Sequence, residues 1–233
     1  MSFTFKQFHC DDSRCGMKIS TDGVLLGAWA GIEHAGHIAD IGAGSGIIAL
    51  MMAQRNPSAL ITAIDIDPQA CQDARQNVAA SPWNDRIDIR CLDFDLWLPS
   101  KTFDAIVSNP PFFTETMRSP QKARAQARHC SDGLGYRLLV KKASSLLNYG
   151  GLLSVILPAE YESDLIFQAE LSRLKLKRLC RVHTRQDKPP LRILAEFVKG
   201  NTSETTSRLS IYDKDGLYSD EYRQLTSDFY LNF

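Results

Sequence analysis

Short apolar runs alternate with stretches of helical periodicity along most of the chain. Seven runs have the length and the apolar or alternating character of strands: 37–41, 60–64, 86–91, 103–107, 152–157, 175–182 and 191–198. Helical spacing of apolar residues falls between them, at 24–29, 47–54, 69–80, 135–148 and 161–171. This alternation predicts an α/β fold with a doubly wound, seven-stranded Rossmann-like sheet, mostly parallel with an antiparallel edge strand.

The two ends of the chain carry weaker patterns. Residues 1–20 show no clear period, and residues 201–207 are polar enough to predict a loop. In the tail, aromatic residues recur at helical spacing, which predicts a last helix that packs on the body. Because no linker is evident, we expect one domain over residues 1–233. Its expected parts are an N-terminal segment at 1–36, a core at 37–200 and a C-terminal extension at 201–233.

A glycine-rich turn, Gly42-Ala43-Gly44-Ser45-Gly46, joins the strand at 37–41 to the helix that follows. The glycines permit a tight turn and let the backbone approach a ligand closely. The fingerprint for dinucleotides needs a small residue where Ile47 stands, and Asp40 would lie poorly beside a pyrophosphate. A nucleotide-dependent oxidoreductase is therefore disfavoured, and a ligand that carries an ammonium group is favoured.

An acidic residue ends the next strand. Asp65 lies 19 residues after Gly46, which is the position from which a carboxylate binds ribose hydroxyls in doubly wound folds. Asp67 lies beside a helix N-terminus and is expected only to complement the helix dipole. Earlier in the chain, Thr21 or Asp22 is expected to cap the helix that begins there.

The strand at 103–107 stops on Asn109-Pro110-Pro111-Phe112. Proline fixes its own backbone, restricts the preceding residue and donates no hydrogen bond, so this segment is a stiff turn. Open α/β sheets place their sites at the carboxyl ends of strands. The turn therefore presents an amide side chain, free carbonyl groups and an aromatic face to a ligand.

The formal net charge is zero, but basic residues gather in two places. One group follows the turn, where a helix beginning at Ser119-Pro120 would put Arg124 and Arg128 one turn apart. The other group lies at 175–192. Local basic patches can bind phosphates even on a neutral protein, and solvated faces remain the equally favoured alternative.

The six cysteines are scattered without a CxxC pair, which favours reduced thiols. His9, Cys10 and Cys15 are close in sequence, but no second ligand pair follows at zinc spacing, so we expect no metal. No apolar run has the length of a membrane helix and the N-terminus is not a signal peptide. We therefore expect a cytoplasmic protein.

The glycine turn and the Asn-Pro-Pro-Phe turn together resemble the S-adenosylmethionine-dependent methyltransferases. The resemblance implies S-adenosyl-L-methionine as cofactor and a Rossmann-like methyltransferase sheet. It implies a site in which Asp40 and the turn bind the methionine part, Asp65 the ribose, and Asp93 and Phe94 the adenine. The cofactor-binding residues expected from it are Lys18, Thr21, Asp40, Gly42, Gly44, Ser45, Gly46, Asp65, Ile66, Asp93, Phe94 and Asn109. For Asp93 a turn residue is the alternative.

The Asn-Pro-Pro-Phe turn is similar to the motif of methyltransferases that act on planar nitrogens. Such an amine is a poor nucleophile because its lone pair is delocalised into the ring. The Asn109 side-chain oxygen and the Pro110 carbonyl can accept hydrogen bonds from the two N–H groups of the amine and so favour a pyramidal nitrogen in the transition state. With Pro111 and Phe112 they form the expected catalytic set, and Phe112 would stack on the base for about 1–3 kcal/mol.

The N-terminal segment FTFKQFHC…CGMKISTDGVLLGAW decides between substrates, read together with DIGAGSG, SPWNDRI, SNPPF and the terminal YSDEYRQLTSDFYLNF. Together they resemble the bacterial tRNA1(Val) adenine-N6 methyltransferases, over nearly the whole chain. This resemblance implies methylation of N6 of adenine 37, next to the anticodon. It implies tRNA as the partner, bound through Phe112, Arg124 and Arg128, with no membrane and no obligate protein partner. It also places Lys18 and Thr21 on a segment that covers the cofactor, although helix capping explains Thr21 equally well.

Two groups of alternatives stay open at this point. Guanine-N2 methyltransferases that act on ribosomal RNA and glutamine methyltransferases that act on proteins share the turn motif. A binding module without catalysis is disfavoured because Asn109 to Phe112, Asp40 and Asp65 are all present.

Overall fold

The computed structural model describes residues 2–111 and 135–232. Its main sheet has eight strands: β3 (His37–Ile41), β4 (Leu60–Asp65), β5 (Ile87–Cys91), β6 (Phe103–Ser108), β7 (Leu147–Pro158), β8 (Lys175–Arg185), β9 (Pro190–Val198) and β10 (Thr205–Tyr212). The α-helices are α1 (Thr21–Trp29), α2 (Ile47–Arg55), α3 (Pro68–Ala79), α5 (Gly135–Leu146), α6 (Glu162–Leu171) and α7 (Asp220–Thr226). Short 3₁₀ helices, η1 (Phe94–Leu96) and η2 (Ala159–Tyr161), and a hairpin of β1 (Ser2–Thr4) and β2 (His9–Asp11) complete the described elements.

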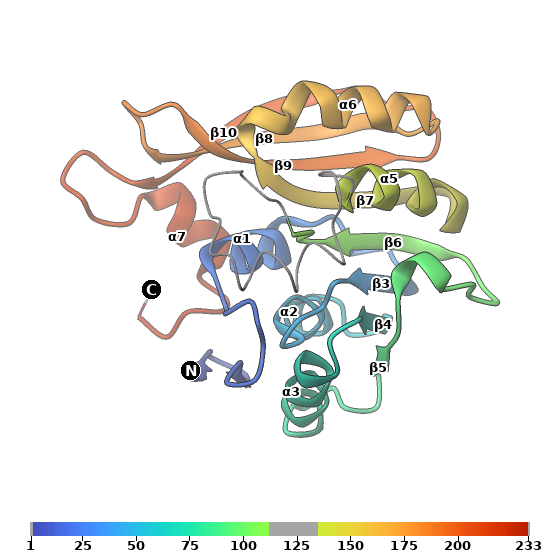
Figure 1. Cartoon of the computed structure of the whole chain (residues 1–233). Coiled ribbons are helices and arrows are strands. Elements are labelled where there is room, and N and C mark those ends of the chain that lie inside the picture. The colour runs from blue at the N-terminus through green and yellow to red at the C-terminus, as the bar shows by residue number, and fades with distance from the viewer. Residues whose placement is uncertain (1, 112–134, 233) are drawn as a thin grey trace, which may run out of the picture.

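The strands follow the order β10-β8-β9-β7-β6-β3-β4-β5 across the sheet (Figure 1). One face packs against α1 and α2, with α7 beside α1, and the other face packs against α5 and α6. Neighbouring residues of β6 show why its centre, Ala105 to Val107, is a continuous apolar run: Val107 belongs to the first core and Ile106 to the second. A strand that is covered on both faces has no polar side to alternate with. The predicted α/β, doubly wound and mostly parallel fold is confirmed.

Two details of the predicted sheet were wrong. The sheet has eight strands instead of seven, and the antiparallel strand β9 lies between β7 and β8 instead of at the edge. The extra strand is β10, whose first three residues fall in the polar stretch expected to be a loop. It lies at the edge of the sheet, where Thr205 to Arg208 are exposed and only Leu209 and Ser210 are buried, so its sequence lacks the apolar pattern of a covered strand.

The two ends of the chain lie together. The Lys6 amide donates to the Phe229 carbonyl at 2.8 Å, and the Phe5 ring contacts the Tyr230 ring at a centroid distance of 6.0 Å (Figure 1). The predicted last helix is confirmed as α7, and its Tyr222 packs into the core. The hairpin of β1 and β2 was not predicted, because strands of three residues are too short to show a period.

The register of the central strands brings three chain segments to one level at the carboxyl edge. Ile41 of β3 pairs with Ile64 of β4 and with Ser108 of β6. The next residues, Gly42, Asp65 and Asn109, therefore leave the sheet side by side. Because neighbouring strands lie about 4.8 Å apart, the Asp65 and Asn109 backbones are roughly 10 Å apart with Gly42 between them. None of the helices that the structure describes has the length and apolar character that crossing a membrane requires.

Candidate active site

The glycine turn between β3 and α2 has the backbone that only glycine adopts easily. Gly42, Gly44 and Gly46 have φ angles of 72°, 56° and 81°. The amides of Gly42 and Ala43 both donate to the Ile64 carbonyl at 2.9 Å. A Cβ on Gly42 or Gly44 would meet no atom within 4 Å, so the turn borders open space where a ligand can approach.

Asp65 fixes this turn from the next strand. One carboxylate oxygen accepts a hydrogen bond from the Gly44 amide at 2.8 Å and the other accepts one from the Asp67 amide at 2.9 Å. Burial raises the pKa of Asp65. Asp67 in turn caps α3 by accepting from the Gln69 amide at 2.9 Å, so its role is a specific capping bond in addition to the expected dipole effect.

Asp40 is the most unusual group at this edge. Its side chain is fully buried, and neither carboxylate oxygen has a hydrogen-bond partner among the described residues. Burial raises the pKa of Asp40 to about 7, the nearby backbone of Ala49 partly opposes this rise, and the Asp65 charge adds a smaller increase. Since a buried polar group without a partner is costly, this carboxyl is suited to a donor that comes from a ligand.

The turn after β6 carries a second unpaired acceptor. The Ser108 hydroxyl donates to the Ile41 carbonyl at 2.7 Å and so ties the end of β6 to β3. The Asn109 side-chain oxygen is buried without a partner in the described part of the chain, Pro110 is buried and Pro111 is exposed. The base-stacking role expected of Phe112 and the RNA contacts expected of Arg124 and Arg128 lie outside the described residues.

The residues expected near an adenine ring follow β4 and β5. Asp93 accepts a hydrogen bond from the Asp95 amide at 2.8 Å and caps η1, so it makes the contact of a turn residue. Phe94 has the Lys142 ammonium over its ring, 4.9 Å from the centroid, and Ile66 is 42% exposed. Asp65 pairs with Cys91, which places these residues beside the acid expected at the ribose. Their contacts with a cofactor stay a prediction.

The N-terminal residues expected to cover the cofactor make contacts of their own. Lys18 donates to the carbonyls of Asp12 and Ser13 at 2.5 and 3.1 Å and holds its own loop. Thr21 is exposed at the start of α1, and the residue that caps the helix is Ser20. The expected N-cap at Thr21 or Asp22 was therefore wrong by one or two positions.

Sequence reasoning missed Asn77, a buried residue of α3. Its amide nitrogen donates to the Ser45 carbonyl at 2.9 Å and to the Asp11 carbonyl at 2.8 Å. Its oxygen accepts from the Asp11 amide at 2.9 Å, so strand β2 is held on the glycine turn. A polar residue next to Ala74 and Val78 on the buried face of a helix was the available signal.

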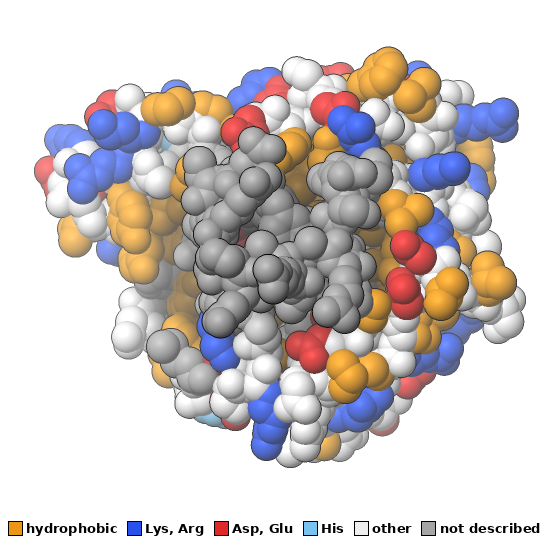
Figure 2. Space-filling model, in the orientation of Figure 1, with side chains coloured by type: hydrophobic (Ala, Val, Ile, Leu, Met, Phe, Trp, Pro, Cys, Tyr) orange, Lys and Arg blue, Asp and Glu red, His pale blue; other side chains and the backbone are white. Residues whose placement is uncertain are grey.

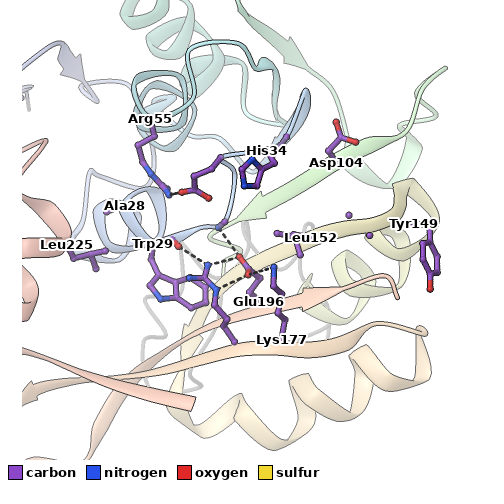
Figure 3. A pocket seen from close by; sticks show the side chains of 16 residues that line it. Ala28, Trp29, His34, Arg55, Asp104, Tyr149, Leu152, Lys177, Glu196 and Leu225 are labelled. Atoms are coloured by element: carbon purple, nitrogen blue, oxygen red, sulfur yellow. Dashed lines mark hydrogen bonds and ion pairs between the residues drawn. The ribbon is translucent and has the colours of Figure 1, made fainter. Parts of the chain in front are cut away.

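A cavity of about 750 Å³ lies at the opposite, amino edge of the sheet (Figure 3). Its central carboxylate, Glu196, is buried and accepts from the Gly31 amide, the Ser154 hydroxyl and the Arg178 guanidinium at 2.8–3.1 Å. Arg178 also lies over the Trp29 ring, 4.2 Å from its centroid. These groups satisfy one another's hydrogen-bonding requirements. The acceptors of Asp40 and Asn109, which have no partner within the described residues, make the carboxyl edge the candidate active site.

Comparisons with known proteins identify the family. Residues 24–178 match the family model described as methyltransferase small domain. A Phocaeicola vulgatus protein named tRNA1(Val) (adenine(37)-N6)-methyltransferase is 44% identical, covering 99% of this chain and 97% of the relative. A Vibrio parahaemolyticus protein of the same name is 42% identical, covering 98% of this chain and 95% of the relative. The chain belongs to this methyltransferase family. The family resemblance drawn from the sequence is thus confirmed.

Solved structures of other methyltransferases share the fold. A protein from Agrobacterium tumefaciens described as a predicted O-methyltransferase aligns with a TM-score of 0.71 at 22% identity, over 89% of this chain and 96% of that chain. A TehB-like SAM-dependent methyltransferase from Corynebacterium glutamicum aligns with a TM-score of 0.51 at 20% identity, over 79% of this chain and 90% of that chain. At these identities the likeness is one of fold.

Proposed function

We propose that this methyltransferase transfers a methyl group from S-adenosylmethionine to the exocyclic N6 of an adenine in tRNA, adenine 37 of tRNA1(Val). The observation that carries the proposal is the buried oxygen of Asn109, which has no partner in the part of the chain that the structure describes and lies one strand away from the glycine turn. Relatives at 40–44% identity that carry the corresponding name support the choice of base and of RNA.

The chemistry of the site fits this cofactor. When bound, S-adenosylmethionine supplies an electrophilic methyl group on a sulfonium and an ammonium group on its amino-acid part. The unpaired carboxyl of Asp40 suits that ammonium, and the space beside Gly42 and Gly44 admits a ligand close to the backbone. Asp65 would bind the ribose hydroxyls while it keeps its hydrogen bond to Gly44.

The turn after β6 would act on the amine of the substrate. The Asn109 oxygen and the Pro110 carbonyl accept hydrogen bonds from its two N–H groups. This localises the nitrogen lone pair and favours the pyramidal geometry of the transition state. Ser108 holds this turn in place through its bond to Ile41. Because both acceptors are attached to a stiff Pro-Pro segment, they are oriented before the base arrives.

The experiment offers three acceptors to the purified protein with labelled cofactor: unmodified tRNA, ribosomal subunits and a release factor. Label in tRNA, recovered as N6-methyladenosine by nucleoside mass spectrometry, is the expected result. Loss of the same nucleoside from position 37 in cells that lack the protein would identify the tRNA. Label in ribosomal RNA guanine or in protein glutamine, with none in tRNA, would refute the proposal.

A further inference from the structure

The β8–β9 hairpin projects beyond the carboxyl edge of the sheet. Pairing between β7 and β9 reaches Pro158 opposite Arg192, and pairing between β8 and β9 continues to His183 opposite Pro190. We call residues 183–190, the projecting end of this hairpin, the arm; Figure 1 shows it reaching past the end of β6. At about 3.3 Å per residue, its tip lies roughly 15–20 Å beyond the level of Asn109.

Most cations of the basic stretch 175–192 that surround the arm are already neutralised. Each paired cation contacts a carboxylate: Lys177 and Arg178 contact Glu196, Arg181 contacts Glu162, and Arg192 contacts Asp22. Such cations would give up an existing ion pair if they bound a phosphate. These residues are therefore weaker candidates for RNA contacts than cations that have no carboxylate to give up.

The cations of the arm itself are different. Arg185 and Lys188 are exposed, and neither makes an ion pair within the described ranges. The turn between them is closed by a 3.1 Å hydrogen bond from the Lys188 amide to the Arg185 carbonyl. A third cation, Arg208 of β10, reaches the arm and donates to the Gln186 carbonyl at 3.2 Å.

The arm carries a net positive charge on the side of the molecule where the active site opens. Its two cations, Arg185 and Lys188, outnumber its one carboxylate, Asp187, and Arg208 of β10 adds a third cation beside them. The loop after β10 reaches Arg185 as well, because Tyr212 pairs with Arg185, and Asp213 follows directly. In Figure 2, Lys and Arg side chains gather on the lobe at the upper left, where Figure 1 places the tip of the hairpin. Exposed cations without carboxylate partners are the groups that bind a sugar–phosphate backbone.

We infer that the arm, with Arg185, Lys188 and Arg208, binds the backbone phosphates of the RNA substrate while its target base lies at Asn109. This inference rests on the proposed function. An adenine in folded RNA must be splayed out of its stack before it reaches the site, at a cost of a few kcal/mol. Phosphate contacts roughly 15–20 Å away offset that cost without reading sequence, and the projecting hairpin supplies them at that distance.

The test measures the affinity of the full chain for an unmodified tRNA1(Val) transcript as a function of salt. Replacing Arg185 and Lys188 together by Ala is expected to weaken binding roughly tenfold at low salt and to reduce the slope of log Kd against log salt by about 1–2. The matched control replaces Lys101 and Lys175, two exposed cations at the amino ends of β6 and β8, and is expected to bind as the wild type does. An unchanged slope in the arm variant, or an equal change in the control, overturns the inference.

A second variant changes affinity in the opposite direction. Asp187→Asn removes the carboxylate of the arm, and it is expected to tighten tRNA binding about two- to fivefold and to steepen the salt slope. A variant that gains affinity cannot owe its result to misfolding, and weaker binding would count against the arm. If the wild type transfers no label to tRNA, the proposed function fails. If the wild type labels tRNA while both arm variants bind tRNA as the wild type does, only the inference about the arm fails. An acidic protein is then the better candidate partner for the arm.

Discussion

The Asp65 carboxylate accepts a hydrogen bond from the Gly44 amide at 2.8 Å, across a sequence separation of 21 residues. The other carboxylate oxygen accepts from the Asp67 amide, so the side chain joins the end of β4 to the glycine turn. The residue that the sequence assigns to the ribose therefore also shapes the surface on which the cofactor would lie. Its structural and its binding contributions can be separated.

Two substitutions of Asp65 make that separation. Asp65→Ala removes both acceptors and leaves two backbone N–H groups unpaired, so the free energy of unfolding is expected to fall by about 2–4 kcal/mol. Asp65→Asn keeps one acceptor and is expected to be less destabilised, yet to bind S-adenosylhomocysteine about 10–100-fold more weakly. Thermal unfolding and titration calorimetry measure the two effects. If Asp65→Asn binds S-adenosylhomocysteine with wild-type affinity, the role of Asp65 is limited to shaping the glycine turn.

The affinity for S-adenosylhomocysteine is expected to depend on pH through Asp40. Burial raises the pKa of Asp40 to about 7 from its ordinary value of 3.8, so in the ligand-free protein its proton is retained to higher pH than in the unfolded chain. The contribution of this group to stability therefore falls as the pH rises from about 4 to 7. Because the ligand's ammonium favours the ionised carboxyl, affinity is expected to rise by up to about tenfold per pH unit between pH 5.5 and 7. Calorimetry over this range checks the rise.

Asp40→Asn is the matched variant for that measurement. Its neutral side chain retains the shape of the site, so its affinity is expected to be lower and nearly independent of pH between 5.5 and 7. A pH profile in this variant that follows the wild type would assign the titration to another group, with Asp65 as the next candidate because burial raises its pKa as well.

The central strands and their ends were predictable because each leaves a local mark in the sequence. Strands such as β6 have a continuous apolar centre because both faces are covered, and the glycines and prolines that follow β3 and β6 mark the carboxyl edge. The positions of Asp40, Asp65 and Asn109 at one edge follow from parallel pairing alone.

Features that depend on contacts between distant residues left no such mark. The basic stretch at 175–192 gave equal reason to expect a phosphate site or a solvated face. The structure shows that strand alternation sends Arg178 and Arg181 to opposite faces of β8, where Glu196 and Glu162 neutralise them. Asn77 is a similar case, since its partners lie 32 and 66 residues away.

Asn109→Ala tests the turn after β6. The substitution removes an acceptor that the proposal uses only for the amine, so kcat for tRNA is expected to fall by about 10²–10³ while the affinity for S-adenosylhomocysteine changes little. Asn109→Asp retains an acceptor oxygen and is expected to keep more of the activity. Single-turnover methylation and calorimetry provide the two readouts. Equal losses of cofactor binding and turnover would show that the side chain is needed for the structure of the site.

Asn77→Ala tests whether the N-terminal segment is held over the glycine turn by this side chain. Asn77 makes three hydrogen bonds at 2.8–2.9 Å to Asp11 and Ser45, and their loss leaves buried backbone groups without partners. We expect the free energy of unfolding to fall by about 2–4 kcal/mol. Hydrogen exchange at residues 9–12 should become faster, and S-adenosylhomocysteine should bind more weakly because the turn loses its support.

Two variants separate this effect from a general loss of stability. Asn77→Asp can still accept from the Asp11 amide but cannot donate to the Ser45 and Asp11 carbonyls, so it is expected to be at least as destabilised as Asn77→Ala. Gln76→Ala removes an exposed neighbour on α3 that contacts only Arg14 through its side chain in the described structure, and it should leave exchange at residues 9–12 unchanged. If these amides stay as protected in Asn77→Ala as in the wild type, the segment is held by its other contacts, such as the 2.7 Å ion pair between Arg14 and Asp73.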